Sequence, residues 1–347
     1  MGCAETISVE TLRKQDDETT TRVIHFLRDH ASFHQLSVVE GNALMERDCL
    51  DREKLRDGIS YAINQGILPP NGNMNAPQQI CIMGKSSEDI CDEIIRAVAA
   101  HRDAKGNGQI ISLQGLSGTG KGTTVRKLSE RLPQTITWSN GNVFRCLTYC
   151  LLRDAVGEAA GDWPPERIRN AHINTTEIGA VVIAKCMGNL EFVFRPDEDS
   201  QANSHPISDI RILPGESAHP ALHVSEIQNT LLKYPNVSRY VPLVAEKTQG
   251  EVIRFTQEIL HKITVDWKWN VLIEGRSETL NYIDTPHRFE LVLSTGPGAR
   301  PDTLMVLGQR RAAQRVVAEF LRAHPSLNLT DEIPKSALER FVRTIIH

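Results

Sequence analysis

The 347-residue chain has no long apolar run, no paired-cysteine motif and no large excess of charge of either sign. Its hydrophobic stretches fall short of the roughly 18 consecutive apolar residues of a membrane-spanning helix, so the sequence predicts none. A net charge of −4 gives no electrostatic basis for binding nucleic acid. What remains is an ordinary globular composition, 40% hydrophobic and 24% charged, long enough for one large or two medium domains.

The seven cysteines are scattered and odd in number, which favours a reducing compartment over a disulfide framework and predicts a cytoplasmic protein. Cys146 and Cys150 stand four residues apart without histidine or cysteine partners nearby. They are therefore predicted to fill a core rather than to hold a metal. No metal site is predicted elsewhere.

The first six residues match the pattern for N-myristoylation of Gly2, with Cys3 as a second acylation site. Two acyl chains would hold the protein stably on a membrane surface, whereas one would bind reversibly. The pattern is short, and a chance match is the alternative. Membrane attachment is thus a hypothesis beside the prediction of a cytoplasmic protein.

The most informative segment is the glycine-rich stretch 115–123, between a strand-like run at 109–114 and a helical pattern at 124–132. Strand, glycine-rich turn, lysine and helix form the context of a phosphate-binding loop. Glycines let backbone N–H groups curl around an anion, the helix N-terminus adds partial positive charge, and Lys121 supplies a full charge. The segment predicts nucleoside triphosphate binding through Gly115, Ser117, Gly118, Thr119, Gly120, Lys121, Gly122, Thr123 and Thr124. A glycine-rich turn that binds nothing is the alternative.

The chain divides into three predicted parts. Residues 1–17 are expected to form a flexible polar tail, and residues 18–107 an extension with helical patches, a candidate strand at 79–83 and no assignable chemistry. Residues 108–347 are expected to form the catalytic domain, with a polar insert at about 174–240.

Within the third part, strand-like runs alternate with helical patterns. The runs after the loop lie at 135–138, 270–273 and 288–293. Such alternation predicts an α/β fold, a parallel sheet flanked by helices in three layers.

Two further segments place arginines near predicted strand ends. Arg145 lies one turn into a helix after the run 135–138 and a turn at Gly141, and the run 270–273 continues into Glu274-Gly275-Arg276. Ligands of open α/β sheets collect at the carboxyl ends of the strands, and a guanidinium suits a phosphate. A surface arginine and a simple Glu–Arg ion pair are the alternatives.

Taken with the loop, these segments resemble the cytidylate kinase family of nucleoside monophosphate kinases. The family's Gly-Lys-Gly-Thr loop is followed by a Gly-x-x-[Tyr/Phe]-Arg-x-Leu-Thr motif, matched at 141–148, and by an acidic-Gly-Arg strand end, matched at 274–276. The likeness spans residues 108–318 in the family's order. It implies a phosphate-loop fold with an inserted monophosphate-binding subdomain, and transfer of the γ-phosphoryl group of ATP, with Mg²⁺, to CMP, dCMP or UMP.

The resemblance also implies roles for single residues. Lys121 would hold the donor, Arg145 and Arg276 would hold the acceptor phosphate, and Ser139 and Glu274 would contact the acceptor. Lys121 and Arg276 are the catalytic residues that it implies outside the lid.

The chain departs from the family in several places. Gln114, Ser139 and Ser277 replace acidic residues, and the arginine-rich lid and final strand are shortened or missing. The nearest candidates for lid arginines are Arg310, Arg311 and Arg315, of which Arg310 and Arg311 are predicted to be catalytic. An exposed basic helix face is the alternative. These departures keep two alternatives open, a nucleotide-binding scaffold with weakened catalysis and a phosphate-loop kinase for another small acceptor.

Overall fold

The main sheet of the computed structural model has five parallel strands in the order β2-β9-β3-β8-β4. The structure describes residues 5–72, 75–100, 106–156, 171–174, 178–195, 207–214, 220–293 and 301–346. The strands are β2 (Gln78–Cys81), β3 (Ile110–Gly115), β4 (Thr135–Trp138), β8 (Asn270–Gly275) and β9 (His287–Val292). The prediction of a parallel sheet from these runs is confirmed.

Helices cover both faces of this sheet, because alternate side chains of each strand point to opposite sides. Ile111 and Leu113 of β3 pack in one core with α4 (Ser87–Ala100) and α5 (Lys121–Arg131). Val271 and Ile273 of β8 belong to a second core, on the opposite face. That core includes α6 (Asn140–Val156), α10 (Pro235–His261) and the π-helical turn η3 (Lys262–Asp266).

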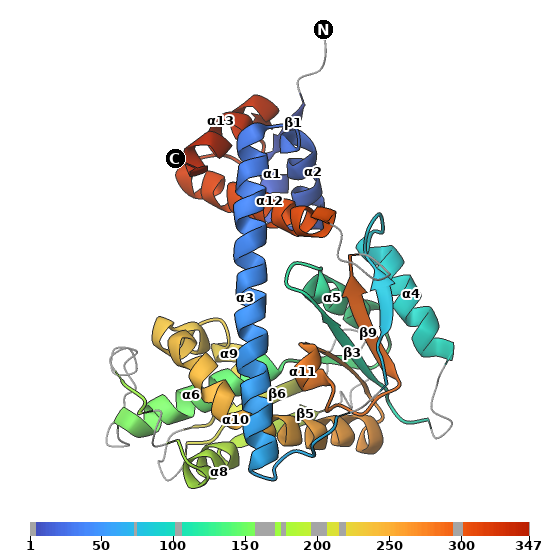
Figure 1. The fold of residues 1–347 in the computed structure, drawn as a ribbon, viewed down its shortest axis with the longest axis vertical. Helices are drawn as coiled ribbons and strands as arrows, with labels where there is room; N and C mark the ends of the chain where they lie inside the picture. The colour runs from blue at the N-terminus through green and yellow to red at the C-terminus, as the bar shows by residue number, and fades with distance from the viewer. Residues whose placement is uncertain are drawn as a thin grey trace.

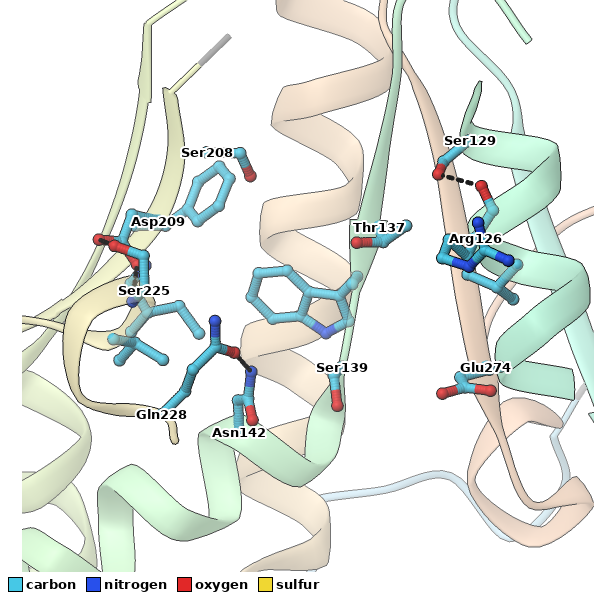
Figure 2. Close-up of a pocket in the computed structure, with 16 residues that line it drawn as sticks. Arg126, Ser129, Thr137, Ser139, Asn142, Ser208, Asp209, Ser225, Gln228 and Glu274 are labelled. Atoms are coloured by element: carbon cyan, nitrogen blue, oxygen red, sulfur yellow. Dashed lines mark hydrogen bonds between the residues drawn. The ribbon is translucent and has the colours of Figure 1, made fainter. Parts of the chain in front are cut away.

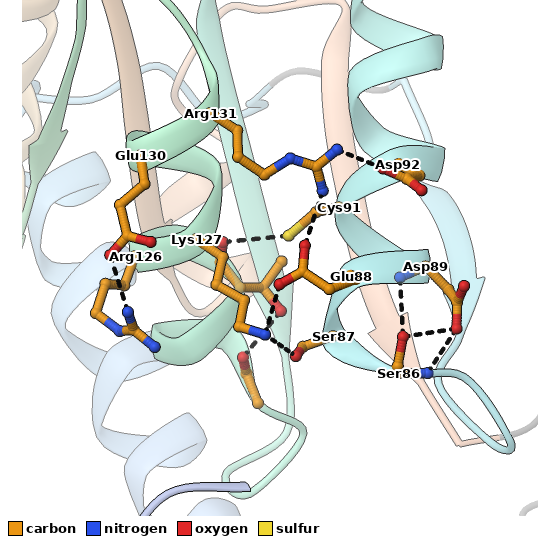
Figure 3. A network of polar contacts seen from close by, with 12 residues as sticks. Ser86, Ser87, Glu88, Asp89, Cys91, Asp92, Arg126, Lys127, Glu130 and Arg131 are labelled. Atoms are coloured by element: carbon orange, nitrogen blue, oxygen red, sulfur yellow. Dashed lines mark hydrogen bonds and ion pairs between the residues drawn. The ribbon is translucent and has the colours of Figure 1, made fainter. Parts of the chain in front are cut away.

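The N-terminal segment contributes directly to the sheet. The edge strand β2 pairs with β9, and Ile80 is fully buried against Leu291 and its neighbours. Lys127 of α5 donates to Glu88 and Ser87 of α4, both at 2.7 Å, which ties the helix after the glycine loop to this segment (Figure 3). The expected boundary at residue 108 therefore needs correction, because β2 and α4 lie on its N-terminal side and complete the sheet.

The first and last described elements of the chain meet in a helical cluster at one end of the molecule (Figure 1). Strand β1 pairs antiparallel with β10, and Ile7, Val9 and Leu12 are fully buried. The expectation of a flexible tail over residues 1–17 is thus wrong from residue 5 onward, while Gly2 and Cys3 lie outside the described residues. The elements of this cluster are β1 (Thr6–Ser8), α1 (Val9–Lys14), α2 (Asp17–Leu27), α12 (Pro301–Ala323), β10 (Glu332–Pro334) and α13 (Lys335–Ile346).

One long helix, α3 (Ala31–Asn64), runs from this cluster past the sheet to α10 (Figure 1). Its first half packs on α12 through glycines, since a Cβ on Gly308 would lie 2.0 Å from the Ser37 carbonyl oxygen. Its second half packs on α10, where a Cβ on Gly58 would lie 3.0 Å from the Glu246 carbonyl oxygen. Close backbone contacts therefore hold α3 at two places along its length.

The stretch expected as an insert forms a small antiparallel sheet, β5-β6-β7, with short helices around it. Phe194 of β5 and Trp267 join it to the main core, with ring centroids 4.5 Å apart. Its elements are α8 (Ala180–Gly188), β5 (Leu190–Arg195), β6 (Ile207–Ile212), β7 (Leu222–His223), α9 (Val224–Ile227) and η2 (Leu231–Lys233). No helix in the described part of the chain is both long and apolar enough to span a bilayer.

Candidate functional site

The glycine-rich segment forms a tight turn between β3 and α5. Gly118 and Gly120 have φ angles of 81° and 86°, in the left-handed region that glycine adopts without a steric penalty. Gly120 precedes Lys121, the first residue of α5, so backbone N–H groups at the start of this helix are without helical partners. The loop therefore has the form of an anion-binding site at a helix N-terminus.

The Lys121 side chain folds back along this loop. Its Nζ donates to the carbonyl oxygens of Gly115 and Leu116, both at 2.9 Å. Burial, reinforced by the positive charge of Arg276, lowers the pKa of Lys121 to about 8, although Glu274 and Asp48 act in the opposite direction. Lys121 is thus a half-buried cation at the base of the loop.

A carboxylate from α3 lies in the mouth of the loop. The Ser117 backbone N–H donates to Asp48 at 2.8 Å, and the Ser117 hydroxyl donates at 2.6 Å. Arg276, the residue before α11 (Ser277–Leu280), donates two further bonds to the Asp48 carboxylate, at 2.6 Å and 3.2 Å. Burial alone would raise the pKa of Asp48, but the bonds from Arg276 and Ser117 outweigh it and hold this pKa below its ordinary value. Asp48 is therefore an ionised, buried partner of the loop.

A cavity of about 440 Å³ opens beside the first turns of α5 (Figure 2). One wall carries Arg126 and Ser129 of α5, and the opposite wall carries residues of β6 and α9. The lining residues are Gly122, Val125, Arg126, Ser129, Thr137, Trp138, Ser139, Asn142, Phe192, Ser208, Asp209, Ile210, Val224, Ser225, Gln228 and Glu274. The carboxyl ends of β4 and β8 thus meet the insert in one space, next to the loop.

Polar side chains on the insert side of the cavity are held by hydrogen bonds. Asp209 accepts from the Ser225 backbone N–H at 2.9 Å and from its hydroxyl at 2.7 Å, and His223 Nδ1 lies 3.0 Å from the same carboxylate. Across the cavity floor, Asn142 Nδ2 donates to Gln228 Oε1 at 3.2 Å. The bonds to Asp209 order the insert itself, and the bond from Asn142 joins the insert to α6.

The structure brings some of the predicted site residues together and separates others. The loop residues 115–124 are contiguous with the cavity through Gly122, and Ser139 and Glu274 both line it. Arg145 and Arg276 are not among the described residues that do so. Arg145 instead donates to Asn142 at 3.3 Å.

The expected lid arginines lie on α12, in the helical cluster. Arg311 donates to Gln314 of the same helix at 3.3 Å, and both Arg310 and Arg311 are half-buried. Neither belongs to the described lining of the cavity. Helix α12 approaches the loop through Leu307 instead, because a Cβ on Gly118 would lie 3.4 Å from that side chain.

Sequence reasoning missed Asp48, although the sequence contains a signal for it. Ser37, Gly41, Leu44 and Asp48 recur at intervals of four, three and four residues, the spacing of one helix face, and all four are buried. A carboxylate on an otherwise small and apolar face requires a partner. The identity of that partner depends on the tertiary fold, which brings α3 against the loop.

The hydrogen-bond donors at the loop suit an anion, as the Asp48 carboxylate bound there by Ser117 and Arg276 indicates. A search for groups of three or more side-chain metal ligands among the described residues finds none. Glu274 lines the cavity next to α5, and a Cβ on Gly122 would lie 3.9 Å from its carboxylate. A single carboxylate beside nucleotide phosphates is the environment in which proteins commonly hold Mg²⁺.

No protein-family model matches the chain, and no curated protein matches it. The observed class is an α/β fold whose five-stranded parallel sheet is flanked by helices and accompanied by small antiparallel sheets. This architecture, with a glycine-rich turn after β3, is consistent with a Rossmann-like or a phosphate-loop fold.

Proposed function

We propose that the chain is a phosphotransferase that moves the terminal phosphoryl group of ATP to a nucleoside monophosphate, with CMP, dCMP or UMP as the acceptor. The observation that carries this proposal is the cavity of about 440 Å³ directly beside the glycine-rich loop. Its volume lies within the roughly 300–1,000 Å³ range of small-molecule sites. Trp138 and Phe192 offer apolar surface to a base, and Asn142 and Gln228 offer amides to its polar edge.

Each group has a part in the transfer. Loop N–H groups and Lys121 would hold the donor phosphates, and Glu274, which lines the cavity, would hold Mg²⁺. When bound, Mg²⁺ supplies charge neutralisation to the donor phosphates. The transfer breaks the bond between the terminal phosphorus and the bridging oxygen of ATP and forms a bond to an acceptor phosphate oxygen. Alignment, exclusion of water and neutralisation of charge suffice, without a covalent enzyme intermediate.

A second candidate is a phosphate-loop kinase with a different small acceptor. This candidate is favoured because the two arginines expected to hold the acceptor phosphate are bonded to other side chains instead. Arg276 is bonded to Asp48, Arg145 is bonded to Asn142, and neither is among the described residues lining the cavity. A scaffold that binds nucleotide without turnover is a third reading, which the same experiment separates.

The test measures ADP formation from ATP and Mg²⁺ with CMP, dCMP, UMP and AMP as separate acceptors. We expect turnover with CMP or UMP, and its loss in Lys121→Ala. Lys127→Ala is the matched control, because Lys127 lies on the same helix but donates to α4. Flat rates with all four acceptors, while ATP still binds, would contradict the proposal and favour the scaffold or another acceptor.

A further inference from the structure

The anionic group bound at the glycine-rich loop is the carboxylate of Asp48, a residue of the protein itself. The Asp48 carboxylate accepts hydrogen bonds of 3.2 Å or less from the Ser117 backbone N–H, the Ser117 hydroxyl and the Arg276 guanidinium. A loop N–H, a hydroxyl and a guanidinium are also the donors that a nucleotide phosphate uses. The Asp48 side chain is 1% exposed, so its carboxylate depends on these partners.

The other groups of the loop are also paired or covered within the protein. Lys121 bonds to two loop carbonyl oxygens. Leu44 of α3 and Leu307 of α12 lie against Gly118, because a Cβ there would be 3.7 Å and 3.4 Å from their side chains. The loop thus has its basic groups paired internally and one side covered by α3 and α12.

The backbone around Asp48 is held in place on both sides. Gly41 and Gly308 bring α3 and α12 into backbone contact before Asp48, and Gly58 brings α3 against α10 after it. Because the Asp48 side chain is buried, release of its carboxylate requires α3 to open locally between these two contacts, without displacement of the whole helix. Asp51, one turn further along α3 and 3.7 Å from Arg276, remains as a second carboxylate for the arginine.

We propose that Asp48 is an autoinhibitory group whose carboxylate competes with a nucleotide phosphate for Ser117 and Arg276. Nucleotide binds when the Asp48 side chain leaves the loop. This inference rests on the proposed nucleotide site at the loop, but not on the identity of the acceptor. The opposite role, in which Asp48 positions Ser117 and Arg276 for the nucleotide, predicts the opposite change in affinity when the carboxylate is removed.

The test compares the dissociation constant of Mg·ATP, by calorimetry, for the wild type, Asp48→Asn and Asp48→Ser. We expect both variants to bind at least about tenfold more tightly, since each removes a charge-assisted competitor. Asp57→Asn is the matched control, with the same charge change at an exposed position of the same helix, away from Ser117 and Arg276. We expect its affinity to stay within about twofold of the wild type. Equal or weaker binding by the Asp48 variants overturns the inference.

A measurement on the wild type keeps the test independent of how the variants fold. Release of Asp48 predicts that saturating Mg·ATP speeds amide hydrogen exchange in segment 44–52 of α3, whereas unchanged or slower exchange contradicts it. Wild-type binding without a gain in the Asp48 variants leaves the nucleotide site standing and removes only the autoinhibition. Absence of Mg·ATP binding in the wild type and in every variant removes both.

Discussion

The half-buried ammonium of Lys121, whose pKa is lowered to about 8, is expected to make the proposed nucleotide binding dependent on pH. A phosphate binds the protonated lysine. Below pH 8 the free protein already carries that proton, whereas above pH 8 the lysine must take one up on binding. The affinity for Mg·ATP is therefore expected to fall by about tenfold per pH unit above 8. Calorimetric titrations at several pH values between about 7 and about 9.5 measure this slope.

Lys121→Arg provides the control for this pH dependence, because arginine stays charged throughout the range. Its affinity, even if lower than that of the wild type, is expected to change little with pH. A wild-type profile as flat as that of the variant would show that Lys121 does not hold the phosphate. At the residue scale, then, Lys121 and Asp48 are each expected to change the affinity for Mg·ATP, and the two effects can be measured separately.

At the scale of elements, local patterns predicted the strands and helices near the loop well. The run 135–138 coincides with β4, and the helical pattern at 124–132 corresponds to α5, because each depends on its own short sequence. Helix α3 was predicted only in part, through the helical patches expected within residues 18–107. It packs first on α12 and then on α10, so no single apolar stripe runs along all of it.

The crossing of α3 and α12 gives a prediction at this scale. A Cβ on Gly308 would lie 2.0 Å from the Ser37 carbonyl oxygen, and backbone cannot yield as a flexible side chain does. Gly308→Ala must push the two helices apart, and we expect it to lower the free energy of unfolding by about 1–3 kcal/mol. Denaturant unfolding followed by circular dichroism measures the loss.

Gly188→Ala is the comparison for that variant. Gly188 ends α8, and a Cβ there would meet no atom within 4 Å. Alanine is also the better helix former, so stability is expected to stay the same or rise slightly. Equal stability of Gly308→Ala and the wild type would mean that the helices do not cross this closely, and would weaken the view that α3 is fixed beside the loop.

At the scale of the whole molecule, pairings between distant segments decide the architecture. Ile80 of β2 stands in a short apolar run and Ile7 of β1 lies between Thr6 and Ser8, so either segment could pair with any strand. Nothing in the local sequence identifies β9 and β10 as their partners. The same holds for the site. The loop lysine and Glu274 were recognised from motifs, whereas Asp48 joins them only because α3 crosses from the helical cluster to α10. The sequence therefore predicts most strands of the sheet and misses the long-range packing that joins them to the two terminal segments.

These pairings predict that residues 108–347 do not fold on their own. That fragment lacks β2, which would leave the β9 edge unpaired, and lacks α4, which covers the sheet face beside α5. It also lacks α1, α2 and α3, against which α12 and α13 bury their apolar faces. We expect an aggregating fragment without a cooperative thermal transition, while residues 5–347 keep the transition of the full chain. Circular dichroism melting measures the thermal transition of each fragment, and size-exclusion chromatography measures its aggregation. A soluble 108–347 fragment that unfolds cooperatively would contradict the prediction, because it would show that this part folds without the N-terminal segment.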